Sequence, residues 1–378
     1  MNPVISEIRV HQVEIPLLRP FVTAVRETSH ISSLIIEVRD SSGRSGWGEA
    51  VANWKVTGES PASIRAVAAD PLTATIIGQP PAAVLEAELL AQAVAHNASA
   101  RAAVECAVHD LAAQEAGLSL AEFLGYSTLA VRTDMTLSIA SSDELVARAK
   151  DFYQQGFTTL KIKVGPAPEH VEAVLAVRAA LPDAALRVDA NQAWSPRQAI
   201  THINTWQERG ARLDFVEQPV DAPDISGLAT VTRNVDTPIM ADEAVRTISD
   251  LEQVISQDAA QLINVKLAKT GGLREAQRVI TQAHDHGITP LMGSMMESTV
   301  GLTAAAALAG AEPEEIHDLD AGLWQSHPII DGGITHANNR VRLPQAPGLG
   351  IRRLEVPTDN PVPATSLPTH ADSCGGTQ

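Results

Sequence analysis

From about residue 132 onward, short apolar segments alternate with amphipathic ones, and this alternation limits the possible folds more than any other feature. The segments between the apolar ones carry helix starts, such as Ser141 with Glu144 in a capping-box pattern and Ser195 followed by Pro196. Eight segments have the character of buried strands: DMTLSIA, TLKIKVG, ALRVDAN, DFVEQPV, PIMADEA, LINVKLA, TPLMGSM and EIHDLDA. This order predicts a parallel β/α barrel. A doubly wound sheet is the alternative, and the lack of a G-x-G-x-x-G motif after the first strands disfavours it.

The rest of the chain is organised around this barrel, which we place at residues 131–322. Residues 1–130 read as an α+β block whose clearest helix, ASARAAVECAVHDLAAQEAG, should close at Gly117. Residues 323–355 return to strand-like and turn-like sequence, and we expect them to pack back onto the N-terminal block. Residues 356–378 are rich in Pro, Thr and Ser, which predicts a disordered tail.

Composition narrows the class of partner. The formal net charge of −17 disfavours nucleic acid, because phosphate backbones attract basic surfaces. The longest apolar run is too short to span a bilayer, and the N-terminal residues lack the pattern of a signal peptide. Two cysteines do not make a disulfide framework. We therefore expect a soluble, cytoplasmic protein that acts on a small molecule.

A charged side chain closes most of the predicted strands. These residues are Lys163, Asp189, Glu217, Asp242, Lys266 and Asp318, and the first five follow one another at intervals of 24 to 28 residues. In a β/α barrel the carboxyl ends of all strands open onto one mouth, where active sites lie. The strand-end charges are therefore predicted to converge there.

Three of the acids, Asp189, Glu217 and Asp242, fall on consecutive strands. Carboxylates crowded into one mouth repel each other unless a cation lies between them. Oxygen ligands without His or Cys suit Mg²⁺, or Mn²⁺, better than zinc. We therefore predict a divalent metal site, with ordinary strand-end acids paired to nearby bases as the alternative.

The two strand-end lysines precede and follow these acids along the barrel. Lys163 and Lys266 should face each other across the metal, so that one removes a proton from a carbon acid and the other returns it. Lys161 shares a strand face with Lys163, and we expect its charge to lower the pKa of Lys163 and to help hold a substrate carboxylate. Snorkelling surface lysines are the alternative.

The motifs TLKIKVG, RVDANQAW, EQPV, MADEAV, NVKLAKTGG and GSMMES together resemble the muconate-lactonising-enzyme subgroup of the enolase superfamily. The resemblance runs from about residue 4 to residue 352. It implies a (β/α)7β modified TIM barrel under an α+β capping domain, built from the N-terminal block and the C-terminal segment. It also implies a lysine base, Mg²⁺ and an enediolate, which is the established chemistry of the superfamily.

Within the subgroup, the Asp-x-Asp at Asp318 and Asp320 resembles the motif by which dipeptide epimerases bind the substrate's free ammonium. The physics agrees, because two carboxylates at i and i+2 of a strand share a face and form an anionic pocket. Arg26 resembles the capping-loop arginine that binds a glutamyl carboxylate, with a surface ion pair to Glu27 or a neighbour as the alternative. The resemblance adds a hydrogen bond between Lys266 and Glu243, and pocket-lining positions at Thr136, Ser294, Met295 and Met296.

The resemblance thus implies a Mg²⁺-dependent L-Ala-D/L-Glu-type dipeptide epimerase, a homo-oligomer acting in cell-wall peptide recycling. The spacing leaves open which lysine serves which epimer. An N-acylamino acid racemase, an o-succinylbenzoate synthase or an epimerase with another side-chain preference are the nearest alternatives. A Schiff-base aldolase and a non-catalytic barrel are more distant ones.

Overall fold

The computed structural model describes residues 2–355, so the tail predicted at 356–378 lies outside the described residues. Seven parallel strands form one sheet in the order β11-β10-β9-β8-β7-β6-β5. Their bounds are β5 (Met135–Leu137), β6 (Thr159–Lys163), β7 (Ala185–Asp189), β8 (Leu213–Glu217), β9 (Ile239–Ala241), β10 (Leu262–Val265) and β11 (Thr289–Met292). Each lies inside one of the predicted strand segments or begins one residue before it.

An eighth strand closes this sheet into a barrel. β12 (Ile316–His317) pairs in parallel with β4 (Ala130–Thr133), which runs almost directly into β5. On its other side the chain after β12 bridges to β11, where the Asp318 N–H donates to the carbonyl of Met292. The prediction of an eight-stranded parallel barrel is confirmed, and the doubly wound sheet is excluded.

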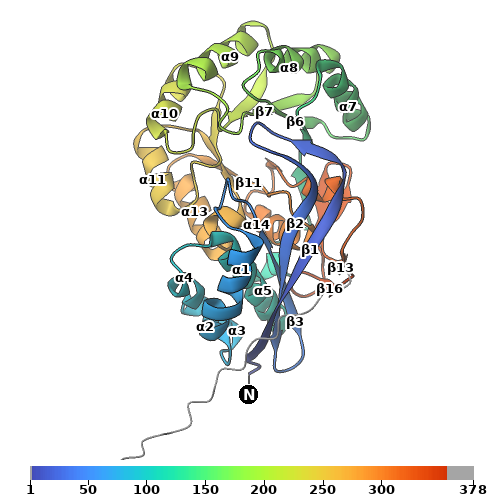
Figure 1. Ribbon diagram of the computed structural model, residues 1–378, viewed down its shortest axis with the longest axis vertical. Coiled ribbons are helices and arrows are strands. Elements are labelled where there is room, and N and C mark those ends of the chain that lie inside the picture. The colour runs from blue at the N-terminus through green and yellow to red at the C-terminus, as the bar shows by residue number, and fades with distance from the viewer. Residues whose placement is uncertain (1, 356–378) are drawn as a thin grey trace, which may run out of the picture.

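Helices cross from each barrel strand to the next and cover the outside of the barrel (Figure 1). They are α7 (Ser142–Gln154), α8 (Glu169–Ala180), α9 (Pro196–Glu208), α10 (Ile225–Arg233), α11 (Ile248–Ser256), α13 (Leu273–Asp285) and α14 (Thr299–Leu308), with the short α12 (Leu267–Thr270) before α13. Seven crossovers and eight strands make the (β/α)7β arrangement. No helix within residues 2–355 is long and apolar enough to cross a membrane.

The predicted helix starts are formed with one difference. Ser195 caps α9 by accepting the N–H of Gln198, and Pro196 is the first helical residue, as the sequence indicates. At α7, Ser141 accepts the N–H of Glu144, but the reciprocal half of the capping box is missing. The Glu144 carboxylate instead pairs with Arg148 one turn later, because an ion pair competes for its oxygens.

The cap consists of a three-stranded antiparallel sheet and a set of helices. The strands are β1 (Ile5–Val22), β2 (Glu27–Asp40) and β3 (Ser45–Val51). The helical segments are α1 (Pro61–Val67), η1 (Ala68–Leu72), α2 (Thr73–Ile76), α3 (Pro81–Glu86), α4 (Leu89–Ala93), α5 (Ala98–Ala116) and α6 (Leu120–Phe123). Helix α5 lies so close to β3 that a Cβ at Gly48 would come 1.9 Å from the carbonyl oxygen of Ala103. The glycine is therefore required by close packing of strand on helix.

The C-terminal segment returns to both parts of the molecule, beside β1 and β2 in Figure 1. After η2 (Ala309–Ala311) in the barrel, the segment begins within η3 (Ala321–Trp324). It contains β13 (Ile330–Gly332), β14 (Thr335–Ala337), β15 (Arg340–Arg342) and β16 (Ile351–Leu354). β15 pairs with β4 of the barrel, whereas Gln325 bridges to Leu17 of the cap. The Leu349 N–H donates to Asp110 on α5. The C-terminal segment thus links the cap to the barrel.

Glu49 on β3 forms a second tie, because its buried carboxylate caps the barrel helix α14. It accepts the backbone N–H groups of Ser298 and Gly301 at 2.9–3.0 Å and the Ser298 hydroxyl at 2.5 Å. Charge at a helix N-terminus is favourable, and these donors have no other partner when the carboxylate is removed.

We therefore expect Glu49→Ala to lower the free energy of unfolding by about 2 to 4 kcal/mol, because buried N–H groups lose a charged acceptor. Urea unfolding followed by circular dichroism measures the change. Glu14→Ala is the control, since Glu14 is exposed and its loss should cost less than about 0.5 kcal/mol. Equal losses in both variants would contradict the assigned role of Glu49.

Candidate active site

The strand-end charges that the sequence singles out all lie at the carboxyl ends of barrel strands. Lys163, Asp189 and Glu217 are the last residues of β6, β7 and β8. Asp242, Lys266 and Asp318 each come one residue after the end of β9, β10 and β12. Strands four places apart in an eight-stranded barrel lie on opposite sides of its mouth. Lys163 and Lys266 stand in this relation, since β6 and β10 are four places apart in the sheet.

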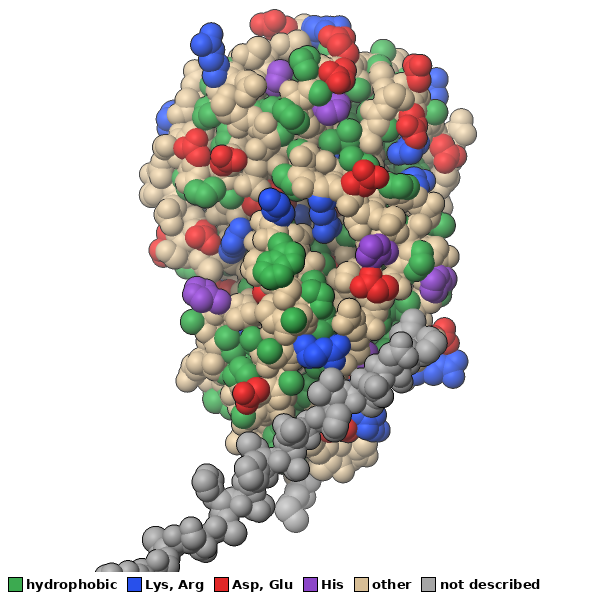
Figure 2. All heavy atoms as spheres, in the orientation of Figure 1, with side chains coloured by type: hydrophobic (Ala, Val, Ile, Leu, Met, Phe, Trp, Pro, Cys, Tyr) green, Lys and Arg blue, Asp and Glu red, His purple; other side chains and the backbone are tan. Residues whose placement is uncertain are grey.

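A single pocket brings most of the predicted residues together at this mouth. The cap contributes Phe21, Thr23, Val25, Arg26, Asn53, Lys55 and Val56, and the barrel contributes Thr136, Lys163, Asn191, Asp242, Glu243, Lys266, Ser294, Met295, Met296, Asp318, Asp320 and Ala321. The predicted residues Lys161, Asp189 and Glu217 do not line it. The space-filling view shows basic side chains around a recess near the middle of the molecule (Figure 2).

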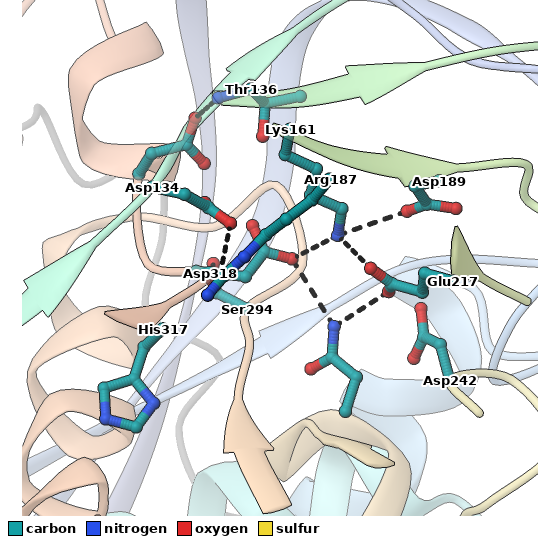
Figure 3. Close-up of polar contacts among 12 residues, drawn as sticks. Asp134, Thr136, Lys161, Arg187, Asp189, Glu217, Asp242, Ser294, His317 and Asp318 are labelled. Atoms are coloured by element: carbon teal, nitrogen blue, oxygen red, sulfur yellow. Dashed lines mark hydrogen bonds and ion pairs between the residues drawn. The ribbon is translucent and has the colours of Figure 1, made fainter. Parts of the chain in front are cut away.

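Lys161 is the charged centre beneath the pocket. Its ammonium lies 2.6 Å from Glu217 Oε2, 2.7 Å from Asp318 Oδ2 and 3.2 Å from Asp189 Oδ2 (Figure 3). Burial alone would lower the pKa of Lys161, but Asp318, Glu217 and Asp189 raise it well above its ordinary value. A lysine that is only 1% exposed is therefore held fully charged by carboxylates from three strands.

Each of the two candidate bases is paired with one of the predicted metal ligands. Lys163 donates to Asp189, and Lys266 donates to Asp242 at 2.8 Å. Although burial lowers the pKa of Lys266, the negative charges of Asp242 and Glu217 raise it above the ordinary lysine value. The charges nearest to the Lys266 ammonium are therefore negative in this arrangement.

The three acids predicted as metal ligands are crowded, as the sequence indicates. Burial and the charges of Asp189 and Asp242 raise the pKa of Glu217 to about 7. Within residues 2–355 no group of three or more His, Cys, Asp or Glu side chains is arranged to hold a metal ion. The ammonium groups of Lys161, Lys163 and Lys266 pair with the carboxylates instead.

The donor chemistry around these acids nevertheless suits a hard cation. Besides the carboxylates, the buried oxygens Asn191 Oδ1, Asn264 Oδ1 and Glu243 Oε2 have no hydrogen-bond donor among the described residues. Buried oxygens without partners are costly, and Mg²⁺ is bound by such carboxylate and amide oxygens. Residues of this type fit the predicted ion, so Asp189, Glu217 and Asp242 stay the predicted ligand set.

Asp318 and Asp320 lie together at the pocket, but not in the way the sequence suggested. They do not share a strand, because β12 ends at His317 and Asp320 lies just before η3. Asp318 bridges to Gly293 after the end of β11, and both carboxylates line the pocket. Burial and the charge of Asp318 raise the pKa of Asp320.

Arg26 lies in the turn between β1 and β2, where the Thr23 N–H donates to its carbonyl. The end of β1 is fixed over the barrel mouth, because the Ile139 N–H donates to the carbonyl of Val22. The side chain of Arg26 lines the pocket, and burial lowers its pKa. Among residues 2–355 no carboxylate lies within 4.0 Å of its guanidinium, so the alternative ion pair with Glu27 is not formed.

The expected hydrogen bond between Lys266 and Glu243 is not formed, so that expectation is wrong. Glu243 Oε1 instead accepts from Asn191 Nδ2 at 3.3 Å, because Asp242 takes the Lys266 ammonium. Sequence analysis also missed Lys269, whose Nζ lies 2.7 Å from Asp242 Oδ1. Its position three residues after Lys266 on a short helix was the available signal. Asn264 was missed as well, and its Nδ2 donates to Glu217 at 2.9 Å.

Comparison with known proteins places this geometry in a family. The model for the mandelate racemase / muconate lactonizing enzyme N-terminal domain matches residues 5–125, and the model for the enolase C-terminal domain-like family matches residues 144–355. The chain is 38% identical over 355 residues to the L-Ala-D/L-Glu epimerase of Bacillus subtilis, with 92% of this chain and 96% of the relative covered.

Solved structures agree with this relationship. A substrate-liganded complex of the L-Ala-D/L-Glu epimerase from Bacillus subtilis superimposes with a TM-score of 0.89 at 37% identity, covering 92% of this chain and 98% of that one. A dipeptide epimerase from Enterococcus faecalis, complexed with Mg and L-Leu-L-Tyr, gives a TM-score of 0.88 at 34% identity, covering 93% and 100%. The chain therefore belongs to the mandelate racemase / muconate lactonizing enzyme family of the enolase superfamily, and it is an isomerase.

Proposed function

We propose that this enzyme is a Mg²⁺-dependent dipeptide epimerase that inverts the α-carbon of the C-terminal residue by 1,1-proton transfer. L-Ala-D/L-Glu is the substrate we favour. The observation that carries the proposal is one pocket that combines two lysines from opposite strands with Asp318, Asp320 and Arg26. A dipeptide offers a group for each: an acidic α-proton, a free ammonium and a distal carboxylate.

The two lysines account for the stereochemistry. A substrate α-carbon held between Lys163 and Lys266 would face one ammonium-bearing side chain on either side of the barrel mouth. One lysine removes the α-proton and the other delivers a proton to the opposite face, so the configuration inverts. In the reverse reaction the roles exchange. When bound by Asp189, Glu217 and Asp242, Mg²⁺ would stabilise the negative charge that develops on the substrate carboxylate.

The remaining residues account for substrate choice. Asp318 and Asp320 form the acidic side of the pocket, which suits a primary ammonium. Arg26 enters from the cap, no carboxylate of residues 2–355 pairs with it, and a guanidinium binds a carboxylate with two parallel hydrogen bonds. Thr136, Ser294, Met295 and Met296 would line the rest of the substrate site. The similarity to an L-Ala-D/L-Glu epimerase and to a dipeptide epimerase complexed with L-Leu-L-Tyr supports the dipeptide class.

The nearest alternatives are an N-acylamino acid racemase, an o-succinylbenzoate synthase and a dipeptide epimerase with another side-chain preference. Incubation with Mg²⁺ and a dipeptide panel in D₂O, followed by mass spectrometry, separates them. Turnover of N-acyl amino acids without deuterium uptake by any free-amine dipeptide would refute the proposal. We propose that the enzyme acts in the cytoplasm as a homo-oligomer and recycles cell-wall peptides.

We expect Lys163→Ala and Lys266→Ala each to slow epimerisation by about 10²- to 10⁴-fold, the usual contribution of one acid–base group. Each variant should still exchange the α-proton of one epimer with deuterium, because the other lysine remains. Proton NMR in D₂O follows both reactions. Lys150→Ala is the control, since Lys150 is exposed on α7. Retention of full epimerisation by either pocket variant would exclude the two-base mechanism.

Glu217→Gln should weaken Mg²⁺ binding at least about tenfold, as loss of a carboxylate near a metal does. Isothermal titration calorimetry with Mg²⁺ alone measures this without reference to activity. Asp214→Asn is a matched control on the same strand, because the Asp214 side chain is 42% exposed and lies beside Arg187. If both variants bind Mg²⁺ as the wild type does, Glu217 is not a ligand.

Arg26→Ala should raise KM for L-Ala-L-Glu about 10- to 100-fold, because a charged hydrogen-bond pair is worth about 1.5–3 kcal/mol. KM for L-Ala-L-Ala should change little, since that substrate has no distal carboxylate. Steady-state polarimetry provides both values. Lys55→Ala removes another cation from the same pocket and tests for a general charge effect. A similar loss for both substrates would refute the assigned role of Arg26.

A further inference from the structure

The carboxylate of Asp320 is held by a tryptophan that does not reach the pocket. Trp324 Nε1–H donates to Asp320 Oδ2 at 3.1 Å, and the backbone N–H of Thr136 donates to the same oxygen at 2.7 Å. Asp320 lines the pocket, whereas Trp324 is 1% exposed and lies behind it. The indole therefore acts on the pocket only through the acid.

The protein also holds Asp318 through only one of its two carboxylate oxygens. Its Oδ2 accepts from Lys161 Nζ at 2.7 Å and from Asn264 Nδ2 at 3.5 Å (Figure 3). Within residues 2–355 no hydrogen bond reaches Oδ1 of Asp318 or of Asp320. Each acid thus gives one oxygen to the protein and keeps the other as an acceptor. A primary ammonium, with three donors, is the group that such a pair of oxygens can bind.

The cap fixes the position of the tryptophan. The guanidinium of Arg19 on β1 lies 4.6 Å from the centroid of the Trp324 ring and 5.0 Å from that of Phe152 on α7. Phe21, two residues further along β1, meets Trp324 edge-on with ring centroids 4.8 Å apart. Cation–π and edge-to-face contacts of this kind each contribute attraction beyond the buried area. Two residues of the cap strand β1 therefore pack on the indole of η3, and one of them, Arg19, also contacts helix α7.

We infer that Trp324 is a positioning residue that orients Asp320 for the N-terminal ammonium of the substrate, and that Arg19 and Phe21 hold Trp324 in place. The inference rests on the proposed dipeptide epimerase and deepens it, because it explains how this site distinguishes a free amine. Without the indole N–H, Asp320 Oδ2 keeps only the N–H of Thr136 as a partner. The carboxylate then turns more freely, and its second oxygen is no longer held toward the ligand.

The test compares Trp324→Phe with Trp206→Phe. Trp206 is also 1% exposed and also loses an indole hydrogen bond, in this case 3.0 Å to the Val171 carbonyl in the helix layer. Calorimetric titration of Mg²⁺-loaded protein with L-Ala-L-Glu should show about tenfold weaker binding for Trp324→Phe, whereas N-acetyl-L-Ala-L-Glu should bind within twofold of wild type. KM for the free-amine dipeptide should rise with kcat within twofold. Trp206→Phe should leave all of these values unchanged.

If Trp324→Phe does not fold, Arg19→Met provides the second variant, because it keeps the indole but removes the cation that packs on it. It should show a smaller loss of the same preference for the free amine. Equal weakening of both peptides, or unchanged binding in a folded Trp324→Phe, would overturn the inference. Deuterium exchange by the wild type tests the proposed function separately. Dipeptide binding that depends on Trp324 without exchange would refute the epimerase and retain the inference.

Discussion

Four buried lysines set against the acids at the strand ends are the interaction on which this barrel mouth depends. Each of these lysines (Lys161, Lys163, Lys266 and Lys269) pairs with at least one of the carboxylates at the carboxyl ends of β7, β8 and β9. None of these groups could be buried alone, because an isolated charge in an apolar interior costs far more than a domain's net stability. Arranged together, they neutralise one another. The mouth is thus a dense set of alternating charges rather than an ordinary hydrophobic core.

The same ion pairs affect both the position of the side chains and their proposed chemistry. An ion pair between a proposed base and a predicted metal ligand, such as Lys266 with Asp242, holds both side chains in position and raises the pKa of the lysine. The raised pKa values of Lys161 and Lys266 express that pairing. A lysine that accepts a proton from a substrate must first lose the proton that its carboxylate partner stabilises, so that carboxylate has to pair with another cation. Among residues 2–355, Asn191 Oδ1 and Asn264 Oδ1 are buried oxygens without a hydrogen-bond donor and are further oxygens suited to a cation.

The cap contributes more than a cover. Glu49 caps a barrel helix, and Arg19 and Phe21 hold the indole behind Asp320. Arg26 and Lys55 reach the pocket from two different turns of the cap. In the proposed function the groups at the strand ends form the reaction centre and bind the substrate ammonium, whereas the cap supplies Arg26 for the distal carboxylate. This division fits a scaffold in which different side chains on the loops change specificity without disturbing the barrel.

The sequence by itself determined the barrel and the identity of its charged residues. The periodicity of strands and helices is a local pattern, and so is the placement of a charged residue at a strand end, as at Lys163, Asp189, Glu217, Asp242 and Lys266. Local patterns of this kind are kept in the folded structure. Only the tertiary structure decided which charges pair. The pairing of Lys161 with Asp318, the preference of Lys266 for Asp242 and the contact of Trp324 with Arg19 all join residues distant in the chain. Such pairings depend on distances across the barrel and on burial, which spacing along a chain does not encode.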